Sequence, residues 1–319
     1  MPSRPIPTQF DNRNVVELRG PKATLNEMEP YEFLVEKELL SDSQTGDSIT
    51  VFLTNRECGF KCVMCDLWKN TLDESVNRGS IPFQIRQVLE KSTAAKQIKL
   101  YNSGSFFDSK SIPAEDHAEI ASLCDPFENV VVENHPKLVD ERVLGFRDRL
   151  KGKLEVAMGL ETANEAVLAR LNKQMTADDF KRAAGFLREC DIAVRTFVLL
   201  NPPFMSSGED GIEWAIKSIE FAVKAGSGCV AVIPTRAGNG AMEVIEKEGL
   251  YTKPEIRSIE RVMDAVLPIE EVRVFSDLWE MRKFAKCEAC ADQRISRLER
   301  MNFTQMPSEK IGCGECGGE

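Results

Sequence analysis

The chain has 319 residues, a formal net charge of −10 and 42% hydrophobic residues. This charge argues against a protein that binds nucleic acid through a broadly basic surface, because such binding depends on Lys and Arg neutralising phosphates. No apolar run approaches the roughly 20 residues needed to span a bilayer, and the start, MPSRPIPTQF, has no apolar signal region. We therefore expect a cytoplasmic protein with no membrane partner.

Residues 1–46 are polar and predict an N-terminal extension that packs on the rest of the chain, with one helical stretch near PYEFLVEKELL. In residues 47–241, β-branched runs alternate with amphipathic helical patterns, which is typical of βα units around a parallel sheet. Six strands are predicted, at 49–54, 97–101, 129–133, 154–159, 193–200 and 229–234. Such units either close into a full or partial barrel or form an open doubly wound sheet, and both bind ligands at the carboxyl ends of the strands.

The pattern changes after residue 241. Residues 242–319 predict a C-terminal appendage with two helices, one short strand in VRVFS, and a tail that carries the sequences CEAC and CGEC. We treat this appendage as separate from the repeated βα units.

Three cysteines follow the first predicted strand with the spacing C-x3-C-x2-C: Cys58, Cys62 and Cys65. A tetrahedral zinc site needs four ligands. The trio therefore indicates either a distant fourth ligand, for which His117 and His135 are the two histidines of the chain, or a metal that keeps one coordination position open.

The cysteine spacing resembles that of the radical S-adenosylmethionine (radical SAM) enzymes. The resemblance implies a partial (β/α)6 TIM-like barrel and a 4Fe–4S cluster whose fourth iron binds S-adenosylmethionine, which is cleaved to a radical that abstracts hydrogen from a substrate. It also implies a reductant such as flavodoxin or ferredoxin. Family members often have an aromatic residue before the third cysteine; this chain has Met64, an apolar side chain able to cover the adenine.

Two further strand ends resemble the same family. After the second strand, YNSGSFFD matches a small, glycine-containing motif near the methionine amino group, which implies that Ser103, Gly104 and Ser105 line the cofactor. After the third strand, VENHP resembles an E-x-N/H-P ending, which implies that Glu133 faces S-adenosylmethionine.

The later strand ends supply the remaining candidates. The stretch GLETANEAVLARLNK resembles a G-x-Q/E-S/T motif and implies that Glu161 and Thr162 lie near the ribose. Asn201 and Arg236 follow the fifth and sixth strands, and Arg195 begins the fifth; each is either a substrate or carboxylate contact or part of a structural ion pair. The sequence assigns no catalytic residue.

A second cysteine set near the C-terminus has the spacing C-x2-C-x22-C-x2-C and consists of Cys287, Cys290, Cys313 and Cys316. Four thiolates in two knuckles are typical of a closed structural zinc site. The same ligands also hold 4Fe–4S clusters. The sequence leaves zinc, a second cluster and a metal-free tail open.

Taken together, the motifs are most like the stand-alone radical SAM group that includes the radical subunit of archaeosine synthase. That resemblance implies cleavage of a lysine-derived adduct on a 7-deazaguanine base of tRNA, with tRNA or a partner protein as binding partner. Two alternatives stay open: a radical SAM enzyme with an auxiliary cluster that acts on a small molecule or peptide, and a non-catalytic zinc-binding adaptor.

Overall fold

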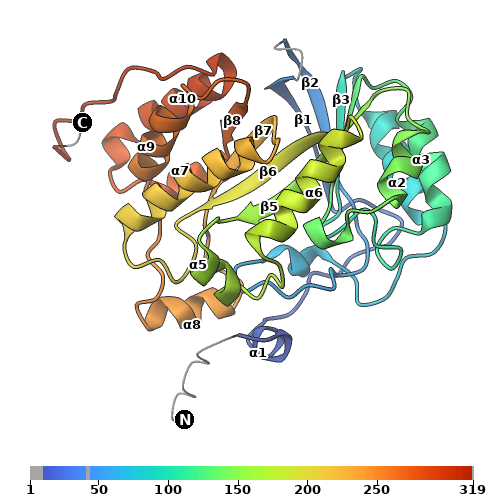
Figure 1. Cartoon of the computed structure of the whole chain (residues 1–319), viewed down its shortest axis with the longest axis horizontal. Coiled ribbons are helices and arrows are strands. Elements are labelled where there is room, and N and C mark those ends of the chain that lie inside the picture. Colours follow the sequence, from blue (N-terminus) through green and yellow to red (C-terminus); the bar gives the residue numbers. More distant parts are fainter. Residues whose placement is uncertain (1–9, 41–43, 318–319) are drawn as a thin grey trace.

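The computed structural model describes residues 10–40 and 44–317 (Figure 1), so residues 1–9 of the predicted N-terminal extension lie outside the described residues. The described chain forms one eight-stranded sheet in which the strands lie side by side in chain order. The strands are β1 (Glu32–Leu39), β2 (Thr45–Phe52), β3 (Gln97–Tyr101), β4 (Asn129–Glu133), β5 (Lys153–Glu161), β6 (Ala193–Leu200), β7 (Cys229–Pro234) and β8 (Arg273–Ser276). β1 is antiparallel to β2, and the other neighbouring pairs are parallel.

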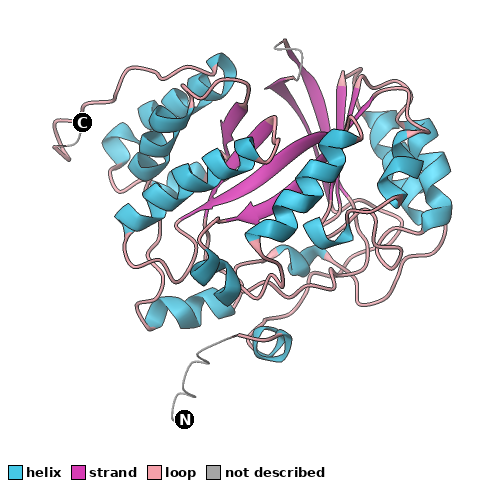
Figure 2. Ribbon diagram, viewed as in Figure 1, coloured by secondary structure: helices cyan, strands magenta, loops and turns pink. Residues whose placement is uncertain are grey.

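Helices connect the strands and cover one face of the sheet, as Figure 2 shows. The α-helices are α1 (Asn12–Glu17), α2 (Ser80–Lys91), α3 (His117–Leu123), α4 (Arg142–Arg147), α5 (Glu165–Arg170), α6 (Ala177–Glu189), α7 (Gly208–Lys224), α8 (Ala241–Lys247), α9 (Ile256–Val266) and α10 (Glu288–Thr304). Short 3-10 helices lie at η1 (Leu67–Asn70), η2 (Ala114–Asp116), η3 (Pro136–Leu138) and η4 (Met281–Phe284). Among the described residues, no helix combines the length and apolar character needed to cross a membrane.

Alternate residues of each parallel strand form the core with the helices. On β2 and β3, for example, Ile49, Val51, Ile98 and Leu100 are buried in one apolar cluster with residues of the surrounding helices. Successive side chains of a strand point to opposite faces. The residues between these core positions therefore lie on the other face of the sheet, which we call the inner face.

The predicted partial barrel of βα units is confirmed, and all six predicted strands are present. The helical prediction near residues 30–40 is wrong, because this segment forms β1. Its Glu, Lys and Leu residues favour a helix in isolation, but pairing along the edge of β2, from Glu32 opposite Phe52 to Leu39 opposite Thr45, overrides that preference. β8 also joins the sheet, so the region after residue 241 contributes a strand to it.

The sheet curls strongly at the amino-terminal ends of its parallel strands. Arg195 of β6 contacts Glu38 of β1 at 3.0 Å, although five strand spacings separate these strands and would place them about 24 Å apart in a flat sheet. Arg273 of β8 donates to the Leu39 carbonyl oxygen of β1 at 3.0 Å. The first strand therefore meets the last, and the inner face is enclosed at this end.

Five charged side chains, which we call the floor network, fill the inner face there: Glu38, Lys99, Glu155, Arg195 and Arg273. Arg195 also contacts Glu155, at 3.1 Å. Burial opposes ionisation of Glu38, but Arg195 and Lys99 outweigh it and lower the pKa of Glu38 to about 2. Of the two roles that the sequence left open for Arg195, the structure shows the ion pair.

Replacing Arg195 with Met is expected to lower the free energy of unfolding by about 3–5 kcal/mol, because it removes a buried cation that contacts two buried carboxylates. The matched control is Arg182→Met, which breaks an ion pair whose arginine side chain is 70% exposed and is expected to cost less than about 1 kcal/mol. Urea unfolding of both variants measures the difference. Equal losses would contradict the structural role given to the floor network.

Candidate active site and C-terminal metal centre

The three cysteines of the first motif lie in the loop between β2 and η1, at the carboxyl end of β2. Cys62 is buried, and Cys58 and Cys65 are half-buried. Burial raises the pKa of all three thiols, that of Cys62 to about 12. Metals bind the thiolate form of cysteine. Because burial disfavours the negative charge of a thiolate, the positive charge of a bound metal is needed to stabilise it.

Loops from two other strand ends hold this cysteine loop by its backbone. The Val63 amide donates to the Leu171 carbonyl oxygen, after β5, at 2.9 Å. The side chain of Asn239, after β7, donates to the carbonyl oxygens of Val63 and Cys65 at 2.7 and 3.1 Å. The position of the thiols is therefore set by hydrogen bonds that do not involve the sulfurs.

The loop after β3 lies directly against the first cysteine. A Cβ atom added to Gly104 would lie 3.4 Å from Cβ of Cys58, so the two loops pack closely at this point. The Glu133 carboxylate, at the end of β4, accepts from the amides of Asn102 and Gly104 at 2.5 and 3.3 Å. Burial raises the pKa of Glu133 to about 7 even though these amides, with that of Ser103, favour its charged form.

At the end of β5, Glu161 and Lys173 form a buried ion pair with Oε1 and Nζ 2.6 Å apart. Gly159 makes room for the pair, since a Cβ atom there would lie 2.1 Å from the Glu161 carboxylate. Burial opposes the charge of Lys173, but Glu161 and the Cys62 thiol raise its pKa above the ordinary value. Lys173 lies two residues after Leu171, whose carbonyl oxygen accepts from the Val63 amide, so this buried cation lies close to the cysteine loop.

Three more predicted residues lie near this end of the sheet. The Ser105 hydroxyl accepts from the His135 amide at 3.1 Å, so it ties the β3 loop to the β4 loop. Thr162 accepts from the Asn164 amide at 3.1 Å. Met64 is half-buried and packs against the apolar cluster that contains Val63.

The last two predicted residues make their contacts outside the cysteine loop. Asn201 donates to the carbonyl oxygen of Thr252. Arg236 pairs with Asp277 at 2.9 Å and donates to the Trp279 carbonyl oxygen at 2.6 Å. The structure therefore connects Arg236 to the segment after β8.

The residues around the cysteine loop fit an iron–sulfur cluster with a polar ligand beside it. The three thiols lie on one loop, Gly104 lies against Cys58, and Lys173 is a buried cation near this loop. The Asn102 side chain is fully buried, and within the described chain neither its amide nitrogen nor its oxygen has a hydrogen-bond partner. A buried amide without partners is costly, so a bound polar group there is the expected partner.

Sequence reasoning missed three residues of this site: Lys173, Asn239 and Asn102. Lys173 and Asn102 lie inside the motif stretches GLETANEAVLARLNK and YNSGSFFD, and Asn239 lies three residues after the candidate Arg236. The sequence shows only that each is a polar residue in the segment that follows a predicted strand. The residues that each one contacts are known only from the fold.

Above the floor network, the inner face carries aromatic rings. Tyr31, just before β1, is half-buried, as are Phe52, Tyr101 and Phe197, which adjoin fully buried core residues of β2, β3 and β6. Their ring centroids follow one another at 5.5, 6.3 and 6.2 Å. The Tyr31 hydroxyl lies 3.2 Å from that of Ser103, which links this aromatic row to the β3 loop.

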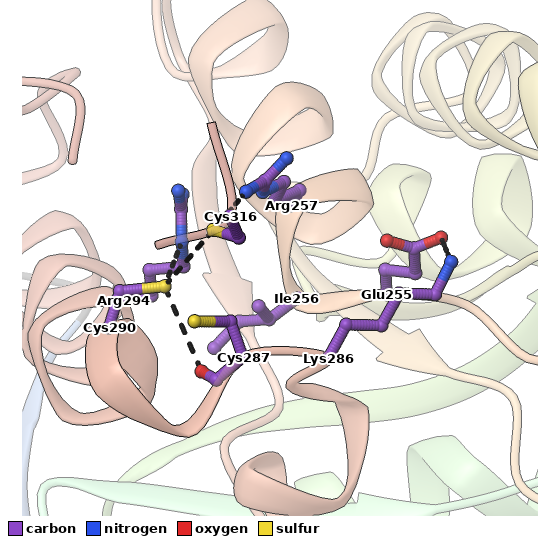
Figure 3. Close-up of a pocket in the computed structure, with 8 residues that line it drawn as sticks. All are labelled: Glu255, Ile256, Arg257, Lys286, Cys287, Cys290, Arg294 and Cys316. Atoms are coloured by element: carbon purple, nitrogen blue, oxygen red, sulfur yellow. Dashed lines mark hydrogen bonds and ion pairs between the residues drawn. The ribbon is translucent and has the colours of Figure 1, made fainter. Parts of the chain in front are cut away.

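The four C-terminal cysteines form a second centre, and their sulfurs all lie within 4.8 Å of one another. Figure 3 shows three of them, Cys287, Cys290 and Cys316. Cys287 and Cys290 lie at the start of α10, and Cys313 and Cys316 lie in the segment that follows this helix. Backbone amides of Cys316 and Glu315 lower the pKa of Cys313 to about 7. The group could bind a metal ion.

Three curated proteins are similar in sequence to this chain, and no family model matches it. Archaeosine synthase subunit beta of Methanosarcina acetivorans is 26% identical over 90% of this chain and 87% of its own length. The Thermococcus kodakarensis protein of the same name is 32% identical over 50% of this chain and 52% of its own. An uncharacterised protein of Methanocaldococcus jannaschii is 26% identical over 74% of this chain and 69% of its own.

Solved structures show the same fold at low sequence identity. SuiB of Streptococcus suis matches with a TM-score of 0.54 and 13% identity over 70% of this chain, and it has also been solved with S-adenosylmethionine bound. Methylornithine synthase matches with a TM-score of 0.50 and 14% identity over 69% of this chain. This chain spans 48% of SuiB and 63% of methylornithine synthase.

The chain shares the fold of SuiB and methylornithine synthase, and this fold is the partial barrel that the sequence led us to expect. Among curated proteins, its distant relatives include two archaeosine synthase beta subunits.

Replacing Lys173 with Met is expected to lower the free energy of unfolding by about 3–5 kcal/mol, because it leaves the Glu161 carboxylate buried without its cation. The double variant Glu161→Gln, Lys173→Met removes both charges and should lose much less. Chemical unfolding of the two variants tests this. A double variant as unstable as the single one would show that the pair does not act as a unit.

Proposed function

We propose that this protein is a radical SAM enzyme that reductively cleaves S-adenosylmethionine and abstracts a hydrogen atom from its substrate. The observation that carries the proposal is the trio of Cys58, Cys62 and Cys65 at the carboxyl end of β2, with the buried cation Lys173 near this loop and Gly104 against Cys58. In this fold, loops at the carboxyl ends of the strands form the site.

In the proposed enzyme, Cys58, Cys62 and Cys65 would hold a 4Fe–4S cluster through their thiolates. When bound and reduced by the electron donor, such a cluster would supply the electron for cleavage of the sulfonium bond of S-adenosylmethionine. Lys173 offsets the negative charge of the thiolates, and its ion pair with Glu161 fixes the position of the ammonium group. Gly104 lets the loop after β3 lie close to Cys58, and the Asn102 amide offers a donor and an acceptor to the bound ligand.

For the substrate, we propose a modified 7-deazaguanine base in tRNA, on which the enzyme acts as a lyase. Two observations support this choice. The distant curated relatives include archaeosine synthase beta subunits. In addition, the aromatic row on the inner face offers Tyr101 and Phe197 as flat surfaces, and bases bind to aromatic side chains by stacking.

The net charge of −10 bears on how such an RNA would be bound. A protein with this charge gains little from the phosphate backbone. We therefore propose that a partner protein supplies most of the contacts to tRNA, that a flavodoxin or ferredoxin delivers the electron, and that the enzyme acts in the cytoplasm.

Changing Cys58, Cys62 or Cys65 to Ala is expected to abolish 5′-deoxyadenosine formation, because each change removes one of three cluster ligands. The assay is anaerobic reconstitution with iron and sulfide, reduction with dithionite, and detection of 5′-deoxyadenosine by mass spectrometry. Cys190→Ala is the control, since Cys190 is a half-buried thiol that packs against the core. A colourless parent protein that does not cleave S-adenosylmethionine would contradict the proposal and favour a non-catalytic zinc-binding adaptor.

Changing Phe197 to Ala is expected to lower kcat/KM for a deazaguanine-containing RNA about tenfold, since one stacking contact contributes about 1–3 kcal/mol. Cleavage of S-adenosylmethionine without substrate should persist, because Phe197 lies on the inner face rather than in the cysteine loop. Phe186→Ala on α6 is the control for loss of a half-buried ring. An unchanged kcat/KM in the Phe197 variant would exclude the aromatic row as the base-binding surface.

A further inference from the structure

We infer that the four C-terminal cysteines bind a single zinc ion, rather than an iron–sulfur cluster, and that this ion holds the C-terminal segment of residues 306–317 against α10.

The sulfur separations point to one ion. With zinc–sulfur bonds of about 2.3 Å, the sulfurs of a regular tetrahedral site lie about 3.8 Å apart. Here Sγ of Cys287 and Sγ of Cys313 are 3.9 Å apart, those of Cys290 and Cys316 are 4.0 Å apart, and all four lie within 4.8 Å. In an iron–sulfur cluster the thiolates bind different irons, which separates them further.

The surroundings match the charge of such a site. Four thiolates around one divalent ion leave two net negative charges. Two arginines donate to the sulfurs: Arg257 to Cys316 at 2.6 Å and Arg294 to Cys290 at 3.3 Å. These donors offset that charge, and Figure 3 shows both beside the sulfurs. The four ligands are all protein thiols, so the site is closed and structural in type.

The segment after α10 depends on this centre because it has little else to hold it. None of residues 306–317 is buried, so the segment contributes no side chain to a core. Apart from the cysteines, the segment is held by backbone carbonyl groups that accept from two buried arginines of α10. Arg294 binds the Ile311 carbonyl oxygen at 2.9 Å, and Arg297 binds those of Glu309 and Ser308 at 2.8 and 2.6 Å.

Both arginines are themselves fixed by α9. Glu260 contacts Arg294 at 2.5 Å and Arg297 at 3.4 Å, and Asp264 contacts Arg297 at 2.7 Å. α9 and α10 therefore present a fixed row of donors to the segment. The ion completes this arrangement by joining the first pair of cysteines, on α10, to the second pair at the end of the segment.

The test compares the full chain with its double variant Cys313→Ser, Cys316→Ser, with Cys190→Ser as the control for loss of an unrelated thiol. Metal analysis of the reconstituted protein is expected to give one zinc per chain in the parent and the control and none in the double variant, with equal iron in all three. Cobalt(II) in place of zinc should give the intense absorption of a tetrahedral sulfur site in the parent.

Limited trypsin digestion gives a second readout. Cleavage after the exposed residue Lys310 should be at least tenfold faster in the double variant than in the parent or the control, while the rest of the chain stays resistant. Iron that depends on Cys313 and Cys316, or absence of zinc from the parent, would overturn the assignment. Equal cleavage rates at Lys310 would overturn the role of the ion in holding the segment. None of these readouts depends on radical chemistry at the first cysteine set.

Discussion

The ion pair between Glu38 and Arg195 determines the shape on which the rest of the protein depends. It joins β1 to β6 across the inner face, a contact that only a curled sheet can make. Because its charges are buried, the pair gains from further partners, and Lys99 contacts Glu38 while Glu155 contacts Arg195. The floor network thereby encloses the amino-terminal ends of the strands. The aromatic row lies above it, and the cysteine loop lies at the opposite, carboxyl ends.

The features that the sequence predicted correctly are local ones. The six strands of the βα units follow from runs of β-branched residues, and the gathering of the four C-terminal cysteines follows from their spacing. β1 was missed because its Glu-rich and Lys-rich sequence resembles a surface helix, and its strand character comes from pairing with β2. No sequence pattern within residues 30–40 indicates this pairing, because it depends on the edge of β2.

Contacts between motifs were beyond sequence reasoning for a different reason. Glu161 and Lys173 are 12 residues apart, and their pairing depends on a left-handed backbone at Glu161, with φ of 65°, and on the missing side chain of Gly159. For Arg236, the sequence suggested a ligand contact, but the structure shows an ion pair. Arg236 follows β7, where a ligand-binding arginine is expected, and it pairs with Asp277. A polar residue at a strand end identifies a candidate, and the neighbours that the fold provides decide its role.

The two cysteine sets show how the same ligand is adapted to different tasks. The first offers three thiols from one loop, in a buried setting with Lys173 as the nearby cation, so an iron bound there without a fourth thiolate remains open to another ligand. The second offers four thiols that meet at one point near the surface, with Arg257 and Arg294 donating to two of them. A closed set of this kind leaves no position for a substrate. The first set is therefore the candidate for catalysis, whereas the second is suited to holding residues 306–317 against α10.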